Sequence, residues 1–349
     1  MRVVVVPPDP LWPGRFRAEA GEIARVLGTD AVYIHHIGST SVPGLAAKPI
    51  IDLMPVVRDI HAVDARTSAL AALGYEAMGE FGLPGRRYFR RRAEGNACHV
   101  HVYQSGHPDI ARHLAFRDYL RACPKAAASY GALKETLAAR FPDDLDLYMD
   151  GKDGFIKDTE RAALAWWRTG TAIVLSGPVG VGKTTVGIAL GELLEERGIA
   201  CAFSDFDGLT EISPRSPGDR FGSGLGLLNL ASVWRHARDC GARCLIVPRV
   251  MEAQNDVEGV RSAVGHADVV VVRLTAPLGV LRERLRQRER GAALDWHLRR
   301  AEELAPQLEA TGPADHVVEA GGRVPQDVAR VILERLAPWL PKPPPDCPA

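Results

Sequence analysis

A short glycine-rich segment has the residue spacing of a phosphate-binding loop. The segment reads Gly177-Pro178-Val179-Gly180-Val181-Gly182-Lys183-Thr184 and matches the Walker A pattern GxxxxGK[ST] at every fixed position. Glycines let backbone N–H groups turn toward phosphate oxygens, the lysine reaches the β- and γ-phosphates, and the threonine hydroxyl holds magnesium. The segment therefore predicts ATP and Mg²⁺ as cofactors, with Lys183 catalytic and Thr184 a metal ligand. The predicted cofactor contacts are Gly177, Gly180, Val181, Gly182, Lys183, Thr184 and Thr185.

The sequence around this segment predicts a strand that runs into a helix. Residues 172–176 are apolar and β-branched, which predicts a buried strand, and apolar residues at helical spacing follow the loop. Further strands are expected at residues 199–203, 243–248, 268–274 and 316–319, with helical segments between them. This alternation predicts an α/β fold, a doubly wound parallel sheet with helices on both faces, whose ligands bind at the carboxyl ends of the strands. A chance glycine-rich turn is disfavoured, because strand, loop and helix agree.

Two acids, Asp205 and Asp207, follow the second predicted strand. A carboxylate beside the γ-phosphate can orient an acceptor hydroxyl, accept its proton or hold a magnesium-bound water. We expect Asp205 to be catalytic and to belong to the metal site, and Asp207 to contact the substrate. The alternative for either residue is a cap on the next turn, a position that aspartate favours.

Arginines follow the third and fourth predicted strands. The third strand runs into Pro248-Arg249, where a motor-type ATPase has an acid, so Arg249 is a candidate contact for substrate or phosphate. The fourth strand leads into an arginine-rich helix in which Arg284 and Arg288 share one face. An arginine above the phosphates neutralises the charge that develops in phosphoryl transfer, and these two arginines are the catalytic candidates. A solvated helix braced by its own glutamates is the alternative, and it is favoured for most of the other arginines.

Residues 171–340 resemble the small P-loop kinases of the nucleoside, gluconate and adenylylsulfate kinase type. The resemblance rests on the phosphate loop, on the aspartate after the second strand, and on Val272-Arg273-Leu274-Thr275-Ala276-Pro277 with the arginine-rich helix behind it. It implies a phosphotransferase that moves the γ-phosphate of ATP to a small-molecule acceptor, with that helix beginning a lid over ATP. Residues 211–229 lie where such kinases hold the acceptor, and Arg220 in this segment is a candidate contact for an anionic or polyhydroxyl substrate.

The first half of the chain contains a second candidate site, in residues 35–57. The turn Gly38-Ser39 precedes a predicted strand that carries Asp52, an arrangement in which nucleotidyltransferases hold a nucleotide phosphate and two Mg²⁺ ions. The position of the paired acid, two residues after Asp52, is Met54. Two magnesium ions without paired carboxylates are poorly held, so nucleotidyl transfer is not favoured here.

Polar side chains around Asp52 still predict a binding site. The neighbouring predicted strand carries His99 and His101, which share one face of that strand. A metal ion at these two histidines is disfavoured, because the sequence shows no third ligand. The favoured alternative to a metal is that the two histidines are simply polar residues on a solvent-facing strand. The pocket as a whole could receive a phosphate or carboxylate group. The candidate contacts are Ser39, Lys48, Asp52, His99 and His101, together with the arginines of residues 86–92.

Residues 1–168 resemble the GrpB family, which has a nucleotidyltransferase-like α+β fold. The resemblance rests on residues 35–57 and on three later segments, His99-Val100-His101-Val102, Phe116-Arg117-Asp118-Tyr119-Leu120-Arg121 and Tyr130-Gly131-Ala132-Leu133-Lys134. Fusions of GrpB domains with dephospho-CoA kinases are known, usually with the kinase first, and the order here is the reverse. The predicted organisation is a GrpB-like domain at 1–168 that aids substrate selection or assembly, a P-loop kinase domain at 171–340 and a disordered tail at 341–349.

The composition limits the classes of function. The 349 residues include 43 Lys and Arg against 43 Asp and Glu, and this balance argues against a nucleic-acid coat or a polybasic membrane anchor. No apolar run approaches the roughly 20 residues that span a bilayer. Six scattered cysteines without a CxxC pair fit a reducing compartment. We expect a cytoplasmic protein with a small-molecule substrate, without nucleic-acid or membrane partners, and compatible with a homo-oligomer.

Two other functions stay open from the sequence. Both halves could act on one small molecule, by phosphorylation followed by nucleotidylation. Alternatively, ATP binding could only switch a partner surface, so that the protein would be a non-catalytic, ATP-responsive binding module.

Overall fold

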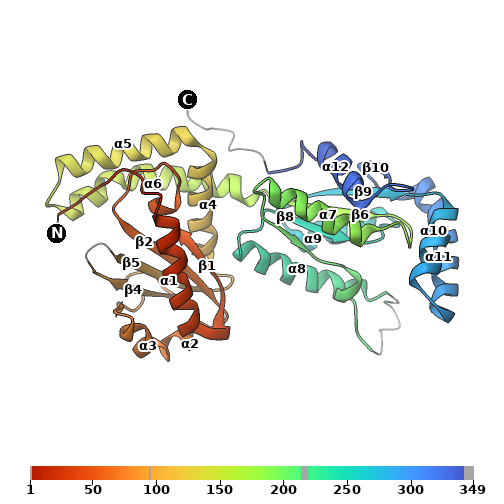
Figure 1. Ribbon diagram of the computed structural model, residues 1–349, viewed down its shortest axis with the longest axis horizontal. Helices are drawn as coiled ribbons and strands as arrows, with labels where there is room; N and C mark the ends of the chain where they lie inside the picture. Colours follow the sequence, from red (N-terminus) through yellow and green to blue (C-terminus); the bar gives the residue numbers. More distant parts are fainter. Residues whose placement is uncertain (1, 94–95, 214–218, 220, 342–349) are drawn as a thin grey trace. The chain divides into compact units, whose positions relative to one another are not determined.

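The computed structural model describes residues 2–93, 96–213, 219 and 221–341. These residues form two compact units, with the boundary between residues 167 and 168. Each unit contains one five-stranded sheet with helices packed on it (Figure 1). Arg220 and most of the predicted tail, from residue 342 onward, lie outside the described residues. Within the described part, no helix is both long enough and apolar enough to cross a membrane.

The first unit is an α+β fold with the strand order β1-β2-β5-β4-β3. Strands β2 and β5 are parallel, and the other neighbours are antiparallel. The strands are β1 (Ala31–Ile37), β2 (Ile50–Val57), β3 (Glu76–Ala77), β4 (Arg86–Arg91) and β5 (Ala97–Gln104). The helices are α1 (Trp12–Leu27), α2 (Ile60–Asp64), α3 (Thr67–Ala72), α4 (Pro108–Ala122), α5 (Pro124–Arg140) and α6 (Leu145–Arg168), with short 3₁₀ turns at Gly28–Asp30 and Ser39–Ser41.

Alternate residues of the central strands in this unit face different helix layers. On β2, Leu53 and Val57 pack with α1, whereas Met54 and Val56 pack with α4, α5 and α6. Successive side chains of a strand point to opposite faces, so Asp52 shares the face of Met54. On the face of β2 that packs against α4, α5 and α6, Met54 and Val56 belong to the apolar core. The polar side chain of Asp52 lies at the other end of this face.

The second unit is a doubly wound parallel sheet with the strand order β10-β9-β6-β8-β7. The strands are β6 (Thr171–Ser176), β7 (Cys201–Phe203), β8 (Cys244–Pro248), β9 (Asp268–Thr275) and β10 (His316–Glu319). The helices are α7 (Lys183–Glu196), α8 (Ser223–Asp239), α9 (Gln254–Val264), α10 (Leu278–Arg288), α11 (Gly291–Thr311) and α12 (Pro325–Arg335), with a 3₁₀ turn at Asp207–Leu209.

Helices cover both faces of this parallel sheet. Helices α7 and α12 pack on one face, over side chains such as Ile173 and Leu175 of β6. Helices α8 and α9 pack on the other, over Ala172 and Val174 of the same strand. Helices α10 and α11 lie side by side (Figure 1). Burial on both faces explains why the four central residues of β6, Ala172 to Leu175, are all apolar.

The fold class predicted from the sequence is confirmed. All five strands of the second unit are found near their predicted positions, and β7 differs most, because it begins two residues later than predicted. The α+β fold of the first unit and the parallel sheet of the second match the expected classes. The carboxyl ends of β6, β7 and β8 lead directly into the residues that the sequence singles out.

Candidate functional site

The phosphate loop connects β6 to α7. Gly182 has a φ angle of 101° and immediately precedes Lys183, the first residue of α7. Gly177 has a φ angle of 137°, and a Cβ atom there would lie 2.5 Å from the carbonyl oxygen of Leu274. Both positions therefore need glycine. The loop curls at the N-terminus of α7, where the helix dipole and backbone N–H groups favour an anion.

The side chain of Lys183 folds back over this loop. Its Nζ donates to the carbonyl oxygens of Gly177 at 2.9 Å and Pro178 at 3.2 Å. Burial lowers the pKa of Lys183 to about 8, and the nearby carboxylates of Asp207 and Asp205 oppose that change. Phosphate oxygens are stronger partners for an ammonium group than neutral carbonyls, so these contacts can be exchanged for a phosphate.

Thr184 and Asp205 are in direct contact. The Thr184 hydroxyl donates to Oδ2 of Asp205 over 2.9 Å. The other oxygen of Asp205 accepts from the backbone N–H of Asp207 at 3.3 Å, which orients the carboxylate. The two predicted metal ligands thus meet beside Lys183, and both offer the oxygen donors that Mg²⁺ prefers.

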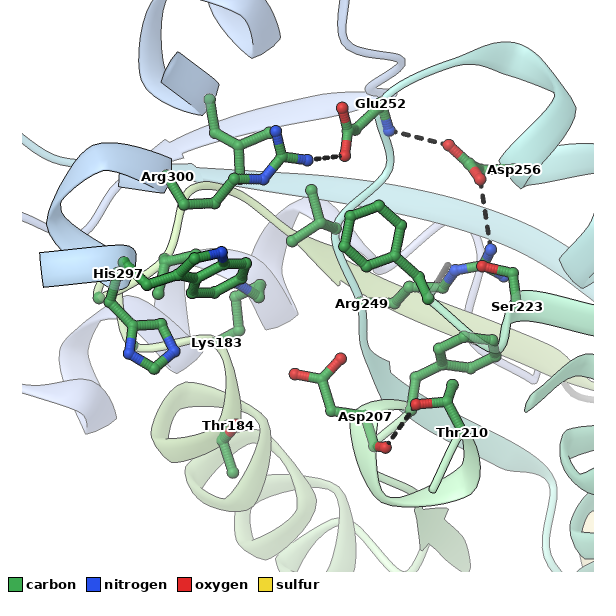
Figure 2. A pocket seen from close by; sticks show the side chains of 18 of the residues that line it. Lys183, Thr184, Asp207, Thr210, Ser223, Arg249, Glu252, Asp256, His297 and Arg300 are labelled. Atoms are coloured by element: carbon green, nitrogen blue, oxygen red, sulfur yellow. Dashed lines mark hydrogen bonds and ion pairs between the residues drawn. The ribbon is translucent and has the colours of Figure 1, made fainter. Parts of the chain in front are cut away.

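A cavity of about 480 Å³ opens beside the phosphate loop (Figure 2). Its lining comes from the loop and α7, from the turn after β7, from the segment after β8, and from α10 and α11. Asp207 points into it, whereas Asp205 is not among the residues that line it. The predicted site residues that line the cavity are Gly180, Gly182, Lys183, Thr184, Thr185, Asp207, Arg249 and Arg288.

Arg249 is a buried cation in the wall of this cavity, with 5% of its surface exposed. Its guanidinium group lies 4.0 Å from the ring centroid of Phe206, and Nη2 donates to Asp256 at 3.3 Å. Burial lowers the pKa of Arg249, and the Asp256 carboxylate opposes this change. Nη1 is buried without a hydrogen-bond partner among the described residues. Since an unsatisfied buried donor costs about 1–3 kcal/mol, Nη1 is a candidate contact for an oxygen of a ligand.

Helix α11 contributes residues that the sequence analysis missed. Trp296, His297 and Arg300 line the cavity. Arg300 forms an ion pair with Glu252 (Figure 2). Glu252 also accepts from Nε2 of Gln307 at 3.2 Å. These contacts join the segment after β8 to α11. No sequence motif identifies Trp296, His297 and Arg300 as site residues. The sequence indicated only that their helix follows the arginine-rich helix α10 in the chain.

The two predicted catalytic arginines of α10 reach different places. Arg288 lines the main cavity. Arg284 donates to the carbonyl oxygens of Val181 at 2.9 Å and Ala320 at 3.1 Å. Arg284 lines a second cavity, of about 280 Å³, that also borders the phosphate loop. Arg284 therefore holds the loop to the segment after β10, while Arg288 can reach a group in the main cavity.

In the first unit, the pairing of β2 with β5 places Asp52 opposite His99. Oδ1 of Asp52 lies 3.3 Å from Nδ1 of His99 and 3.7 Å from Nε2 of His101. Burial raises the pKa of Asp52, but hydrogen bonds from His101 and His99 outweigh it and leave the pKa well below the usual range. A Cβ atom at Gly38 would overlap Oδ2 of Asp52, so only glycine allows the turn to approach this closely.

Lys48 and Ser39 lie in the same neighbourhood. Nζ of Lys48 is 4.7 Å from the ring centroid of Tyr148. Burial lowers the pKa of Lys48, and the charge of Asp52 opposes this change. Burial raises the pKa of Tyr130, with a smaller opposing effect from a hydrogen bond to Ser39 and a further rise from Asp52. The structure thus brings Asp52, His99 and His101 into contact, and the charge of Asp52 also acts on Lys48.

The arginines of residues 86–92 are largely engaged by acids. On β4, Arg87 pairs with Asp64 at 2.6 Å and Arg90 pairs with Glu76 at 2.7 Å. Arg91 on the same strand pairs with a glutamate of α1. The partly exposed pairs of Arg87 and Arg90 contribute roughly 0–1 kcal/mol each, whereas the glutamate partner of Arg91 is buried. They make this segment a braced strand of the sheet.

The family model described as GrpB protein matches residues 2–162. A UPF0157 protein of Streptomyces coelicolor is 40% identical over 148 residues, which cover 42% of this chain and 77% of that protein. The chain belongs to the GrpB family. The UPF0157 protein YqkA of Bacillus subtilis is 47% identical over 155 residues, or 44% of this chain and 45% of that protein, so the match spans less than half of that relative. A dephospho-CoA kinase of Mycolicibacterium paratuberculosis is 30% identical over 189 residues, covering 47% of this chain and 46% of that protein.

Two solved structures resemble parts of the chain. GrpB from Enterococcus faecalis is 47% identical, covers 46% of this chain and 98% of its own, and has a TM-score of 0.45. An APS kinase of Mycobacterium tuberculosis is 21% identical, covers 48% of this chain and 98% of its own, and has a TM-score of 0.36. The identification of a GrpB domain is confirmed by the family model. The GrpB domain carries the Asp52 cluster, and the second unit carries the phosphate loop and its cavity.

Proposed function

We propose that this protein is an ATP-dependent phosphotransferase whose second unit moves the γ-phosphate of ATP to a small-molecule acceptor. The observation that carries the proposal is the contact between Thr184 and Asp205 beside Lys183, next to a cavity lined by Asp207 and Arg249. Groups suited to phosphate, metal and acceptor thus surround one cavity. A kinase among the relatives supports phosphoryl transfer as the type of chemistry.

Thr184 and Asp205 would hold Mg²⁺ through their side-chain oxygens. Mg²⁺ usually takes one or two protein oxygens and keeps several waters, so this pair is a sufficient protein contribution. When bound, the ion neutralises charge on the β- and γ-phosphates. Lys183 would exchange the carbonyls of Gly177 and Pro178 for phosphate oxygens, and the N–H groups of the loop would bind further phosphate oxygens.

Asp207, rather than Asp205, is proposed to activate the acceptor. Asp207 lines the cavity and points into it, whereas Asp205 contacts the Thr184 hydroxyl and is not among the lining residues (Figure 2). The carboxylate of Asp207 would accept the proton of the acceptor hydroxyl as its oxygen attacks the γ-phosphorus, and ADP leaves with the electrons of the broken P–O bond. Arg249 would bind a polar or anionic group of the same acceptor through Nη1.

Helices α10 and α11 are proposed to form a lid over this cavity. Arg288 lines the cavity from α10, where its charge can stabilise the transferred phosphoryl group. The ion pair between Arg300 and Glu252 joins α11 to the segment after β8. Exclusion of water by such a lid favours transfer to the acceptor over hydrolysis of ATP. The GrpB domain would aid substrate selection or assembly.

The variant Lys183→Met tests this function. We expect phosphoryl transfer to fall by roughly a hundredfold or more, because one preorganised cation is lost from the developing charge. Folding should be retained, because the hydrogen-bond partners of Lys183 are neutral backbone carbonyl oxygens. Removal of the lysine therefore leaves no buried charge without a partner. Lys125→Met, at an exposed lysine of α5, is the matched control and should keep full activity. Activity of Lys183→Met near that of the wild type would overturn the proposal.

A further inference from the structure

We propose that Asp52, His99 and His101 of the GrpB domain bind a divalent transition-metal ion. One ligand atom from each side chain lies within 4.8 Å of those of the other two. Oδ1 of Asp52 is 3.3 Å from Nδ1 of His99 and 3.7 Å from Nε2 of His101. Ligands that sit about 2.0–2.2 Å from a tetrahedral Zn²⁺ are roughly 3.4 Å from one another. The two observed distances are therefore close to those of a loaded site.

The sheet fixes this arrangement. Asp52 and His99 are register partners on the parallel strands β2 and β5, and His101 lies two residues further along β5 on the same face. The exposed fractions of the three side chains are 25%, 32% and 15%, respectively. An ion can therefore enter from solvent, and it would keep coordination positions open on that side. Sites built on strands hold their ligands more precisely than sites on loops.

The structure supplies the third ligand that the sequence did not show. Sequence analysis disfavours a metal at His99 and His101 because no third ligand is evident in the sequence. The position of the missing acid, Met54, is fully buried in the core between the sheet and α4–α6. Asp52 therefore has no carboxylate partner at that position, and its neighbours are the two imidazoles.

The donor set selects the class of metal. Two imidazoles and one carboxylate with open positions suit Zn²⁺ and Fe²⁺, whereas Mg²⁺ prefers oxygen ligands alone. The site therefore differs in its metal from the two-magnesium arrangement of nucleotidyltransferases. In sites of this kind the open positions are taken by water or by an oxygen of the substrate.

Arg86 sets which nitrogen of His101 carries the proton. Its Nη1 lies 3.3 Å from Nδ1 of His101, and a guanidinium group only donates, so Nε2 holds the ring proton in this arrangement. Binding of a metal by Nε2 shifts that proton to Nδ1 and opens this one contact. Arg86 keeps its hydrogen bonds to the carbonyl oxygens of Glu80 at 3.2 Å and Phe81 at 2.8 Å. Loading therefore costs Arg86 one of these three hydrogen bonds.

Titration of the full chain with Co²⁺, followed by visible absorption, tests the proposal. Co²⁺ replaces Zn²⁺ with the same ligands and gives d–d bands whose intensity reports coordination by the protein. We expect one equivalent of Co²⁺ to give these bands, and Zn²⁺ to abolish them. His99→Asn and Asp52→Asn should each weaken Co²⁺ binding at least tenfold. Circular dichroism would show whether each variant is folded, and His99, with the most exposed side chain of the three, is the safer substitution.

A second Asp–His pair in the same domain provides the matched control. His61 lies 3.8 Å from Asp64 on the surface, without a third ligand within reach in the described residues. His61→Asn should leave the Co²⁺ titration unchanged. Absence of d–d bands, equal loss in His61→Asn, or a sulfur-to-cobalt charge-transfer band that points to cysteine ligands would overturn the proposal.

Discussion

The hydroxyl of Thr184 donates to Oδ2 of Asp205 over 2.9 Å, although the two residues are 21 positions apart in the chain. The contact joins the first turn of α7 to the residues after β7. We propose that these two oxygens are the protein ligands of Mg²⁺. Asp207, two residues after Asp205, lines the cavity in which the acceptor is proposed to bind. The division of work between the two aspartates can be measured.

Removal of either oxygen should raise the Mg²⁺ requirement of the reaction. For Thr184→Val and Asp205→Asn, we expect the apparent affinity for Mg²⁺ to fall roughly tenfold to a hundredfold. Because the two residues are in contact, their effects should not add, and the double variant should resemble the worse single variant. The measurement is activity as a function of Mg²⁺ concentration, with Thr136→Val, at an exposed threonine of α5, as the control. An unchanged Mg²⁺ dependence would contradict the assignment.

Asp207→Asn should lower the rate of transfer without changing the Mg²⁺ requirement. A positioned general base contributes typically 10²–10⁴-fold to the rate, so a loss of kcat in that range is expected. The same Mg²⁺ titration separates this variant from Asp205→Asn. If Asp207→Asn instead raised the Mg²⁺ requirement and kept kcat, the roles of the two carboxylates would have to be exchanged.

Arg249→Met should raise the KM for the acceptor and leave the KM for ATP unchanged. Arg249 is buried with one nitrogen unpartnered, so its removal should not destabilise the protein strongly. Asp256 would keep its hydrogen bonds from the backbone N–H groups of Glu252 and Ala253. Arg261→Met, at an exposed arginine of α9, is the matched control. Equal effects on both KM values would argue against a specific acceptor contact.

Lys134 should make the stability of the GrpB domain depend on pH. It is 2% exposed, and burial together with the charge of Lys152 lowers its pKa to about 7. In the unfolded chain its pKa is about 10.4. Between these values the unfolded chain binds more protons than the folded one, so the free energy of unfolding rises with pH. At about 1.4 kcal/mol per pKa unit, the rise amounts to a few kcal/mol.

Lys134→Met removes this titration. The variant's free energy of unfolding minus that of the wild type should be largest near neutral pH. This difference should become smaller as the pH approaches about 10. Urea unfolding at several pH values measures the difference, and Lys125→Met should show no such trend. A constant difference between wild type and Lys134→Met across this range would show that the lysine is not held neutral by burial.

Local sequence spacing predicted the parts of the site that lie close together in the chain. The phosphate loop, β6 and α7 are one continuous segment, so the pattern at Gly177–Thr184 was sufficient to place Lys183 and Thr184. The contact between Asp52 and His99 was not visible in the same way, because it depends on the pairing of β2 with β5. Long-range strand pairing leaves no fixed spacing in the sequence.

The wall formed by α11 could not be predicted for a similar reason. Trp296 and Arg300 reach the cavity because α11 packs beside α10, and the partner of Arg300, Glu252, lies 48 positions earlier. The different destinations of Arg284 and Arg288 also depend on packing. Both share a helical face, but Arg284 meets the carbonyl oxygen of Val181, while Arg288, one turn later, lines the cavity.

The central claim is phosphoryl transfer from ATP to a small molecule. The most direct measurement is mass spectrometry of a pooled metabolite and nucleoside library after incubation with the full chain, ATP and Mg²⁺, compared with the same incubation of Lys183→Met. If the protein transfers phosphoryl groups, one class of acceptor should gain the mass of one phosphoryl group, with ADP as the second product. We expect this gain in the wild-type reaction alone. A gain of a nucleotidyl group, or hydrolysis of ATP with every library member unchanged, would contradict it.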